Sequence, residues 1–282
     1  MQATTTANRI LVLGSTGKTG GRIYQTLSNL GLPVRAGSRK APLPFDWDNT
    51  ATWAPVLQHI DAVYISYQPD IAIPAALIAI TEFTRLAVQN GVRKLVLLSG
   101  RGEPEAQECE KVIINSGVDW TIIRASWFAQ NFSEGFLLDS IQAGHVALPV
   151  GSIREPFIDI DDIAEIAVQA LTTEHHNDQL YDVTGPRLLS FQEVIEEIGM
   201  ANGKRILFES VTIDEYADML REYQVPVDYI SMLTYLFTVV LDGRNEHITD
   251  GVEKALCRKA TDFSVYLQKA IAQGVWQDTP VA

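Results

Sequence analysis

The sequence predicts an α/β protein: a doubly wound, parallel Rossmann sheet with a smaller, mainly helical cap at its C-terminal end. Short apolar runs alternate with segments of helical spacing as far as Ala143, and such alternation implies βαβ crossovers within one parallel sheet. A glycine-rich turn, Gly14 to Gly20, directly follows the first apolar run. After Gly144 helical patterns dominate, which predicts the cap.

The first half of the chain supplies most of the expected sheet. Its predicted strands are residues 9–13, 34–38, 44–46, 62–66, 94–99 and 120–124, and its predicted helices are residues 22–30, 50–58, 74–89, 105–115 and 127–143. The first strand is apolar along its whole length, as expected of a parallel strand buried on both faces. The first helix places Ile23, Leu27 and Leu30 on one side.

The rest of the chain is expected to return to the sheet once and then form the cap. Asp161 and Asp162 open a predicted helix over 163–171, where early acids complement the helix dipole. A last sheet strand is expected over 180–183. The pairs Ser190/Glu193 and Thr212/Glu215 have the spacing of capping boxes. The helices of this region are predicted to run to about Met200 and Arg221 and over 230–241 and 254–273.

We expect three regions along the chain. Residues 1–8 form a flexible N-terminus, residues 9–150 form an NAD(P)-binding Rossmann domain, and residues 151–282 form the substrate and cap region. Within the last region, residues 155–185 are expected to return to the sheet domain.

Composition and charge favour a soluble, cytoplasmic protein with a small-molecule partner. The 282 residues are 46% hydrophobic and 20% charged, which is ordinary for a globular protein. The net charge of −13 disfavours nucleic acid, which needs a basic surface. Cys109 and Cys257 lie too far apart in sequence to indicate a metal site or a disulfide framework. No apolar stretch reaches the ~20 residues of a membrane span. We expect no metal and no membrane partner, and either a monomer or a homodimer.

The strongest local motif lies at the first strand-to-helix turn. It consists of Gly14, Ser15, Thr16, Gly17, Lys18, Thr19 and Gly20. Glycine permits a tight turn and the close approach of a pyrophosphate, and the following helix N-terminus offers unpaired N–H groups. The spacing is Gly-x-x-Gly-x-x-Gly rather than Gly-x-Gly-x-x-Gly, so the position of the motif carries the assignment. We expect all seven residues to bind a dinucleotide.

The end of the second strand indicates which dinucleotide binds. An acid here would bind the ribose 2′-hydroxyl, whereas Ser38, Arg39 and Lys40 suit a 2′-phosphate. This segment predicts NADPH (NADP) rather than NADH. The alternative is a basic turn that is merely solvated.

Four segments resemble the NmrA-like family of atypical short-chain dehydrogenases/reductases, which includes NAD(P)H quinone oxidoreductase-like proteins. Residues 10–40 are similar to the start of that family, and Phe45-Asp46-Trp47 resembles a motif of its clavine (ergot-alkaloid) dehydrogenases. Residues 124–132 resemble its Arg-x-x-Trp/Tyr-x-x-Asn-Phe segment, and residues 157–164 its Val/Ile-Asp-x-x-Asp-Ile-Ala segment. The resemblance extends to about Gly203 and is weaker beyond it.

The resemblance implies places for further cofactor-binding residues. Asp46 and Trp47 would lie near the adenine, and residues 64–69, which include Tyr67, would run past the middle of the cofactor. Ser99 and Gly100 would face the nicotinamide. The residues that would close over the nicotinamide end are Ala125, Ser126, Trp127 and Phe128. Plain core packing is the alternative for both tryptophans.

The usual proton donor of short-chain dehydrogenases is missing. That enzyme class uses Tyr-x-x-x-Lys, in which the tyrosine donates a proton and the lysine holds the ribose. Here Gln107 stands four residues before Lys111, and residues 105–115 contain no tyrosine. The remaining catalytic candidates are Ser99, Lys111 and Trp127. Lys111 either holds the ribose or is a surface lysine beside Glu108 or Glu110.

The sequence therefore predicts an NADPH-dependent reductase that delivers hydride to a hydrophobic electrophile such as a quinone, an iminium ion or an enone. Apolar and aromatic walls suit such a substrate. The expected pocket is lined by Tyr67, Trp127, Phe128, Phe132 and residues 232–237. The alternative is a non-catalytic NAD(P)-sensing regulator of the NmrA type. A smaller possibility is an isomerase or cyclase that keeps the cofactor as structure.

Overall fold

Two compact units make up residues 9–277, the part of the chain described by our computed structural model. The first unit contains residues 9–125, 160–183 and 251–258, and the second contains residues 126–159, 184–250 and 259–277. The first segment of the first unit ends at Ala125, whereas we expected the Rossmann domain to run to residue 150. The expected N-terminal region, 1–8, lies outside the described residues. Within residues 9–277 no helix is long and apolar enough to cross a membrane.

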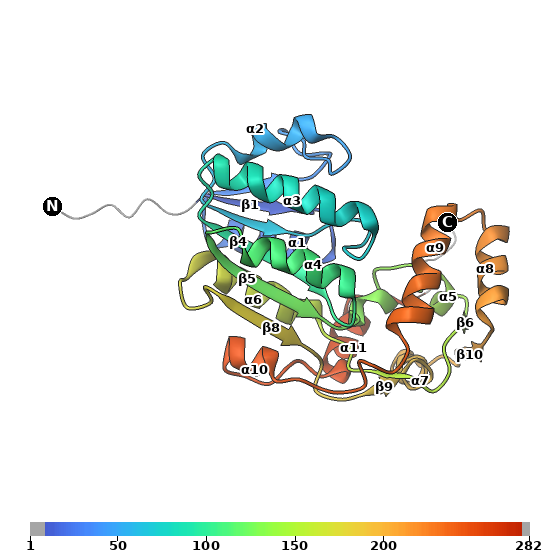
Figure 1. Ribbon diagram of the computed structural model, residues 1–282. Helices are drawn as coiled ribbons and strands as arrows, with labels where there is room; N and C mark the ends of the chain where they lie inside the picture. Colours follow the sequence, from blue (N-terminus) through green and yellow to red (C-terminus); the bar gives the residue numbers. More distant parts are fainter. Residues whose placement is uncertain (1–8, 278–282) are drawn as a thin grey trace. The chain divides into compact units, whose positions relative to one another are not determined.

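The first unit is built on a six-stranded sheet in which every neighbouring pair of strands is parallel (Figure 1). In spatial order its strands are β2 (Val34–Gly37), β1 (Ile10–Leu13), β3 (Ala62–Ile65), β4 (Lys94–Gly100), β5 (Asp119–Ala125) and β8 (Gln179–Val183). All residues of β1 and β3 are buried. These features confirm the predicted Rossmann class.

Helices cover both faces of this sheet. On one face lie α2 (Trp53–Leu57), α3 (Pro74–Gln89) and α4 (Pro104–Ile114), whose apolar side chains share a buried cluster with alternate residues of the strands, such as Val63 and Ile65. Tyr64 points the other way and bonds to α1 (Lys18–Asn29). Helix α6 (Ile160–Thr172) packs against α1, and α10 (Gly251–Leu256) packs against β8.

The predicted strand at residues 44–46 is wrong. These residues form a loop that is held by individual bonds rather than by a ladder. The Phe45 N–H donates to the Ser38 carbonyl at 3.0 Å, and the Trp53 indole N–H donates to the Asp46 carbonyl at 2.8 Å. Because the tryptophan side chain satisfies that backbone carbonyl, the segment stays ordered without a neighbouring strand.

Two predicted long helices are also wrong, because each is interrupted. Residues 127–143 contain a 3₁₀ turn, Ala129–Phe132, and then α5 (Leu138–Gln142). There the Ala129 N–H bonds to the Ile158 carbonyl instead of continuing a helix. Residues 254–273 break after α10, and α11 (Phe263–Ala272) begins anew with Asp262 as its N-cap.

The second unit contains the remaining helices. α7 (Phe191–Asn202) and α8 (Ile213–Glu222) each begin with a complete capping box, which confirms the pairs Ser190/Glu193 and Thr212/Glu215. α9 (Val227–Tyr235) continues into a π-helix, Leu236–Val240. Two small sheets were not predicted from the sequence. They pair β6 (His145–Leu148) with β10 (Leu207–Ser210), and β7 (Arg154–Glu155) with β9 (Leu189–Ser190).

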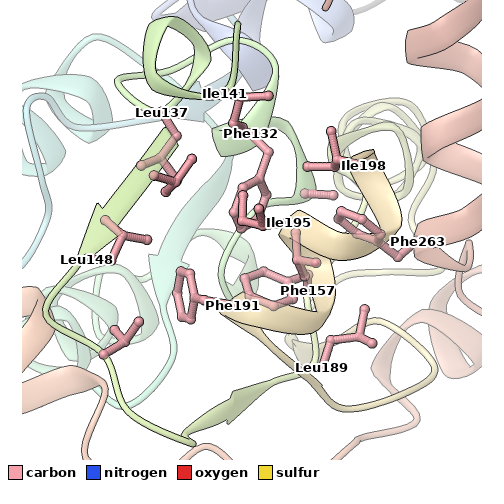
Figure 2. Close-up of a cluster of buried hydrophobic side chains, with 14 of the residues drawn as sticks. Phe132, Leu137, Ile141, Leu148, Phe157, Leu189, Phe191, Ile195, Ile198 and Phe263 are labelled. Carbon is pink, nitrogen blue, oxygen red and sulfur yellow. The ribbon is translucent and has the colours of Figure 1, made fainter. Parts of the chain in front are cut away.

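A cluster of phenylalanines forms the centre of the second unit (Figure 2). Phe132 is 0% exposed, and its ring centroid lies 5.3 Å from that of Phe157 and 6.1 Å from that of Phe263. Phe237 is 4% exposed in the same cluster. We expected Phe132 and parts of residues 232–237 to line a substrate pocket. For Phe132 that expectation is wrong, because burying an aromatic ring in a packed core removes its whole surface from solvent.

Candidate dinucleotide-binding site

The turn between β1 and α1 requires glycine. Gly14 has a φ of +66°, and its carbonyl accepts the Gly17 N–H at 2.8 Å. A Cβ on Gly20 would lie 2.3 Å from the Gly14 carbonyl oxygen and 2.9 Å from the Leu13 carbonyl oxygen. Real atoms do not approach so closely, so α1 reaches this position only without a side chain at residue 20.

The same turn leaves hydrogen-bonding groups for a ligand. Gly17 is the N-cap of α1 and supplies no side-chain cap, so the first N–H groups of the helix have no such partner. Ser15 is buried, and its hydroxyl has no hydrogen-bond partner among residues 9–277. The glycine cradle, the helix N-terminus and this orphaned hydroxyl fit a pyrophosphate group.

The other side chains of the motif point in different directions. Thr16 is exposed, whereas Thr19 is buried and accepts a 2.9 Å hydrogen bond from the Tyr64 hydroxyl. Burial raises the pKa of Tyr64 far above its ordinary value. The resemblance implied that residues 64–69 pass the cofactor. Tyr64 instead lies wholly inside the first unit, where it fastens α1 to β3.

The basic turn after β2 is exposed. The Ser38 carbonyl accepts bonds from the N–H groups of Ala41 and Phe45, which shape the turn. The side chains of Arg39 and Lys40 are exposed and make no hydrogen bond or ion pair with residues 9–277. Two cations that have no partner within the described part of the chain therefore lie at the end of β2, where a phosphate could reach them.

Trp47 belongs to an aromatic cluster. Its ring centroid lies 4.9 Å from that of Phe45 and 5.0 Å from that of Tyr67, and its indole N–H donates to the Ser66 carbonyl at 3.1 Å. Asp46 accepts the Asp48 N–H at 3.2 Å. These contacts fasten the loop before α2 to the end of β3. The adenine contacts of Asp46 and Trp47, and the cofactor contact of Tyr67, stay predictions.

Ser99 donates a hydrogen bond to the buried ion pair of Glu110 and Arg124. Its hydroxyl donates to Glu110 at 2.6 Å, and the Arg124 guanidinium donates to the same carboxylate oxygen at 2.9 Å. Glu110 is 2% exposed, and a buried charge of this kind needs such partners. We did not single out Glu110 or foresee this pair. The sequence did offer a signal for this pair. Glu110 lies on the apolar side of its helix, and Arg124 is a basic residue within an apolar strand.

The other catalytic candidates make contacts of their own, each within its own unit. The Lys111 side chain is 62% exposed and pairs with Glu108 at 2.6 Å, which is the surface arrangement considered as its alternative. Trp127 is half-buried in the second unit, where its ring packs against Phe191 and Phe237. Catalytic roles for Ser99, Lys111 and Trp127 stay predictions.

The predicted residues near the nicotinamide end fall at the end of β5. Ala125 pairs with Gly100 across the two strands β5 and β4. The Ser126 hydroxyl donates to the Pro156 carbonyl at 2.7 Å, and Phe128 forms a parallel bridge with Ile158. Ser126 and Phe128 are thus engaged within the second unit, and their cofactor contacts also stay predictions.

Two acids near the end of β4 were missed, of which Glu103 is buried and Asp70 is half-buried. Glu103 is 7% exposed, and its carboxyl lies over Gly100, where a Cβ would come within 1.9 Å of Oε2. Oε2 has no hydrogen-bond partner among the described residues. Asp70, in the loop after β3, accepts the Ala72 N–H at 2.8 Å. Burial and the charge of Asp70 raise the pKa of Glu103 to about 8, and burial raises the pKa of Asp70.

The comparisons with known proteins place the chain among reductases. No family model matches it. It is 30% identical to festuclavine dehydrogenase of Aspergillus fumigatus over 90% of this chain and 96% of that protein. It is 29% identical to the oxidoreductase YesF of Bacillus subtilis over 92% of this chain and 94% of that protein.

A solved structure shares the fold. The NADPH complex of a quinone oxidoreductase from Escherichia coli matches 93% of this chain and 99% of its own, with a TM-score of 0.75 at 16% identity. The fold likeness agrees with the sequence comparison, and the 30% identity to festuclavine dehydrogenase over 90% of the chain identifies it as a member of the NmrA-like family of atypical short-chain dehydrogenases/reductases.

Proposed function

We propose that this protein is an NADPH-dependent reductase that delivers hydride to a hydrophobic electrophile such as a quinone, an iminium ion or an enone. The observation that carries the proposal is the glycine cradle at the first strand-to-helix turn. In the sheet, β1 lies between β2 and β3, so the order of the strands reverses at β1. Dinucleotides bind at the carboxyl ends of the strands at such a switch point.

The residues around the cradle support NADPH in particular. The N–H groups at the start of α1 would hold the pyrophosphate, and the unpaired Ser15 hydroxyl lies beside them. Arg39 and Lys40 would bind the 2′-phosphate, since neither side chain has a partner within residues 9–277. The solved quinone oxidoreductase was determined with NADPH bound, which supports the same choice.

The side chains near the nicotinamide half bear on the substrate class. When bound, the cofactor supplies a hydride. Ser99 is committed to Glu110, and Lys111 is committed to Glu108, so neither is arranged as the usual proton donor. Substrates that accept hydride readily at an electrophilic centre suit such a site. A quinone oxidoreductase and a festuclavine dehydrogenase among the related proteins support this range.

Binding and turnover test the proposal. The purified chain is titrated with NADPH and NADH by fluorescence, and loss of the reduced nicotinamide absorbance is then followed with a panel of quinones, iminium ions and enones. We expect NADPH to bind more tightly and at least one panel member to be reduced. Tight binding without any turnover would favour the NmrA-type sensor. Failure to bind either dinucleotide would refute the cofactor site.

Gly20→Ala tests the cradle directly. The added methyl would collide with the Gly14 carbonyl, so we expect at least a tenfold rise in the Kd for NADPH, which corresponds to about 1.4 kcal/mol. Thermal unfolding should shift to a lower temperature. Gly21→Ala is the matched control, because its Cβ meets only the Ser15 carbonyl oxygen at 3.6 Å. Equal NADPH affinity for both variants would contradict the assignment.

Arg39→Ala tests the choice between the two dinucleotides. Losing a charge-assisted bond to the 2′-phosphate should raise the Kd for NADPH by roughly 10- to 100-fold and leave the Kd for NADH unchanged. The control is Arg85→Ala, because Arg85 is an exposed residue of α3 paired with Glu82. Titration of each variant with both cofactors measures the effect. A similar loss for NADH would show that Arg39 does not contact the 2′-phosphate.

A further inference from the structure

We propose that the buried Glu103 carboxyl, under the influence of the neighbouring Asp70 charge, holds the proton that the reduction consumes at the nicotinamide end of the cofactor site. This inference rests on the proposed NADPH-dependent reductase. It gives the enzyme an acid at the start of the helix in which the usual tyrosine is missing.

The topology places Glu103 at the carboxyl edge of the sheet, where the nicotinamide half of the cofactor is expected. With a pyrophosphate at the turn after β1, Arg39 and Lys40 at the end of β2 would hold the adenosine half of the cofactor. Residues after β3 and β4 would then hold the nicotinamide half. Asp70 follows β3, and Glu103 follows β4. Gly100 is the last residue of β4, and the Glu103 carboxyl occupies the space in which a side chain at Gly100 would lie.

The Glu103 side chain does not cap the helix that it precedes. Glu103 is the N-cap of α4, where an acid side chain ordinarily accepts an N–H of the first turn. It makes no such bond, and its Oε2 is buried without a partner within residues 9–277. Burying an unpaired polar atom costs stability. Helix capping therefore does not account for the arrangement.

Burial first, and then the negative charges around it, raise the pKa of Glu103 and keep its carboxyl protonated near neutral pH. Asp70 approaches from the loop after β3 and Glu105 from the first turn of α4, and both disfavour a negative charge on Glu103. The neighbouring Arg101 is buried, and its guanidinium lies 3.0 Å from Asp182 of β8. Cys109, one turn further along α4, has a pKa raised to about 12 by burial and stays neutral. A raised acid pKa means that the proton is held below about pH 8 and lost above it.

The reaction balances with this proton. For a quinone, the hydride and its two electrons come from the reduced nicotinamide. The proton leaves Glu103 Oε2 for the substrate oxygen, which becomes a hydroxyl, and the Glu103 carboxylate remains. The positive charge of the oxidised ring stabilises that carboxylate. Water returns the proton once the oxidised cofactor has left. An iminium substrate takes up hydride at carbon and consumes no proton, so its reduction does not draw on Glu103.

The test compares Glu103→Gln with Glu108→Gln, an exposed acid on the same helix. In the wild-type chain we expect NADP⁺ to bind about tenfold or more tightly at about pH 9 than at about pH 6, because only ionised Glu103 attracts the positive ring. NADPH affinity should barely change over that range. An indicator dye should report proton release when NADP⁺ binds at neutral pH. Glu103→Gln should abolish both effects, whereas Glu108→Gln should keep them.

The rate of quinone reduction provides a second test of the role of Glu103. Glu103→Gln should lower kcat for a quinone by about 100-fold or more and leave the Kd for NADPH and the reduction of an iminium ion unchanged. If Glu103→Gln does not fold, Asp70→Asn replaces it. Removing the neighbouring charge should then move the midpoint of the NADP⁺ pH dependence to lower pH.

The outcomes separate the two proposals. If the wild-type chain binds NADPH and reduces quinones, but Glu103→Gln keeps the pH dependence and the rate, Glu103 is not the proton source and the reductase assignment stands. An unchanged midpoint in Asp70→Asn would overturn the influence of Asp70 on Glu103 in the same way. If the wild-type chain binds no dinucleotide, the proposed function fails, and this inference fails with it.

Discussion

The close approach of α1 to the end of β1 is the constraint on which the rest of the site depends. Gly20 allows it, since any Cβ there would lie 2.3 Å from the Gly14 carbonyl oxygen. The Tyr64–Thr19 hydrogen bond, buried between β3 and α1, fastens the helix in that position. The helix N-terminus, which has no side-chain cap, thereby lies directly after the turn at the end of β1. The cofactor placement proposed above, with the adenosine half toward β2 and the nicotinamide half toward β4, depends on that single contact.

Local patterns predicted the parts of the fold that local chemistry determines. The apolar strands, the turn at Gly14 and the two capping boxes depend on residues close in sequence, and the structure contains all of them. The loop at residues 44–46 and the interrupted helix after Trp127 depend on partners far along the chain. The Trp53 indole replaces a strand partner in the first case, and the Ile158 carbonyl diverts the backbone in the second. Periodicity carries no information about such contacts.

The chemistry of the site shows the same division. The residues proposed to bind phosphate were recognisable because glycine spacing and a basic turn are short motifs. The buried acids Glu103 and Glu110 were not, because their character comes from burial. Ser99 resembles a free hydroxyl in the sequence but is committed to Glu110, and Glu103 resembles an ordinary helix start but holds an unpaired oxygen beside Gly100. A missing tyrosine therefore does not mean a missing acid.

Hydrogen–deuterium exchange with and without NADPH tests the central claim most directly, because it reports on the backbone N–H groups themselves. If the cradle binds the pyrophosphate, the amides from Ser15 to Gly20 will exchange more slowly when the full chain is saturated with NADPH. The turn at Arg39 and Lys40 will be protected with NADPH but not with NADH. Unchanged exchange from Ser15 to Gly20 under saturating NADPH would contradict the account, whatever protection appeared elsewhere.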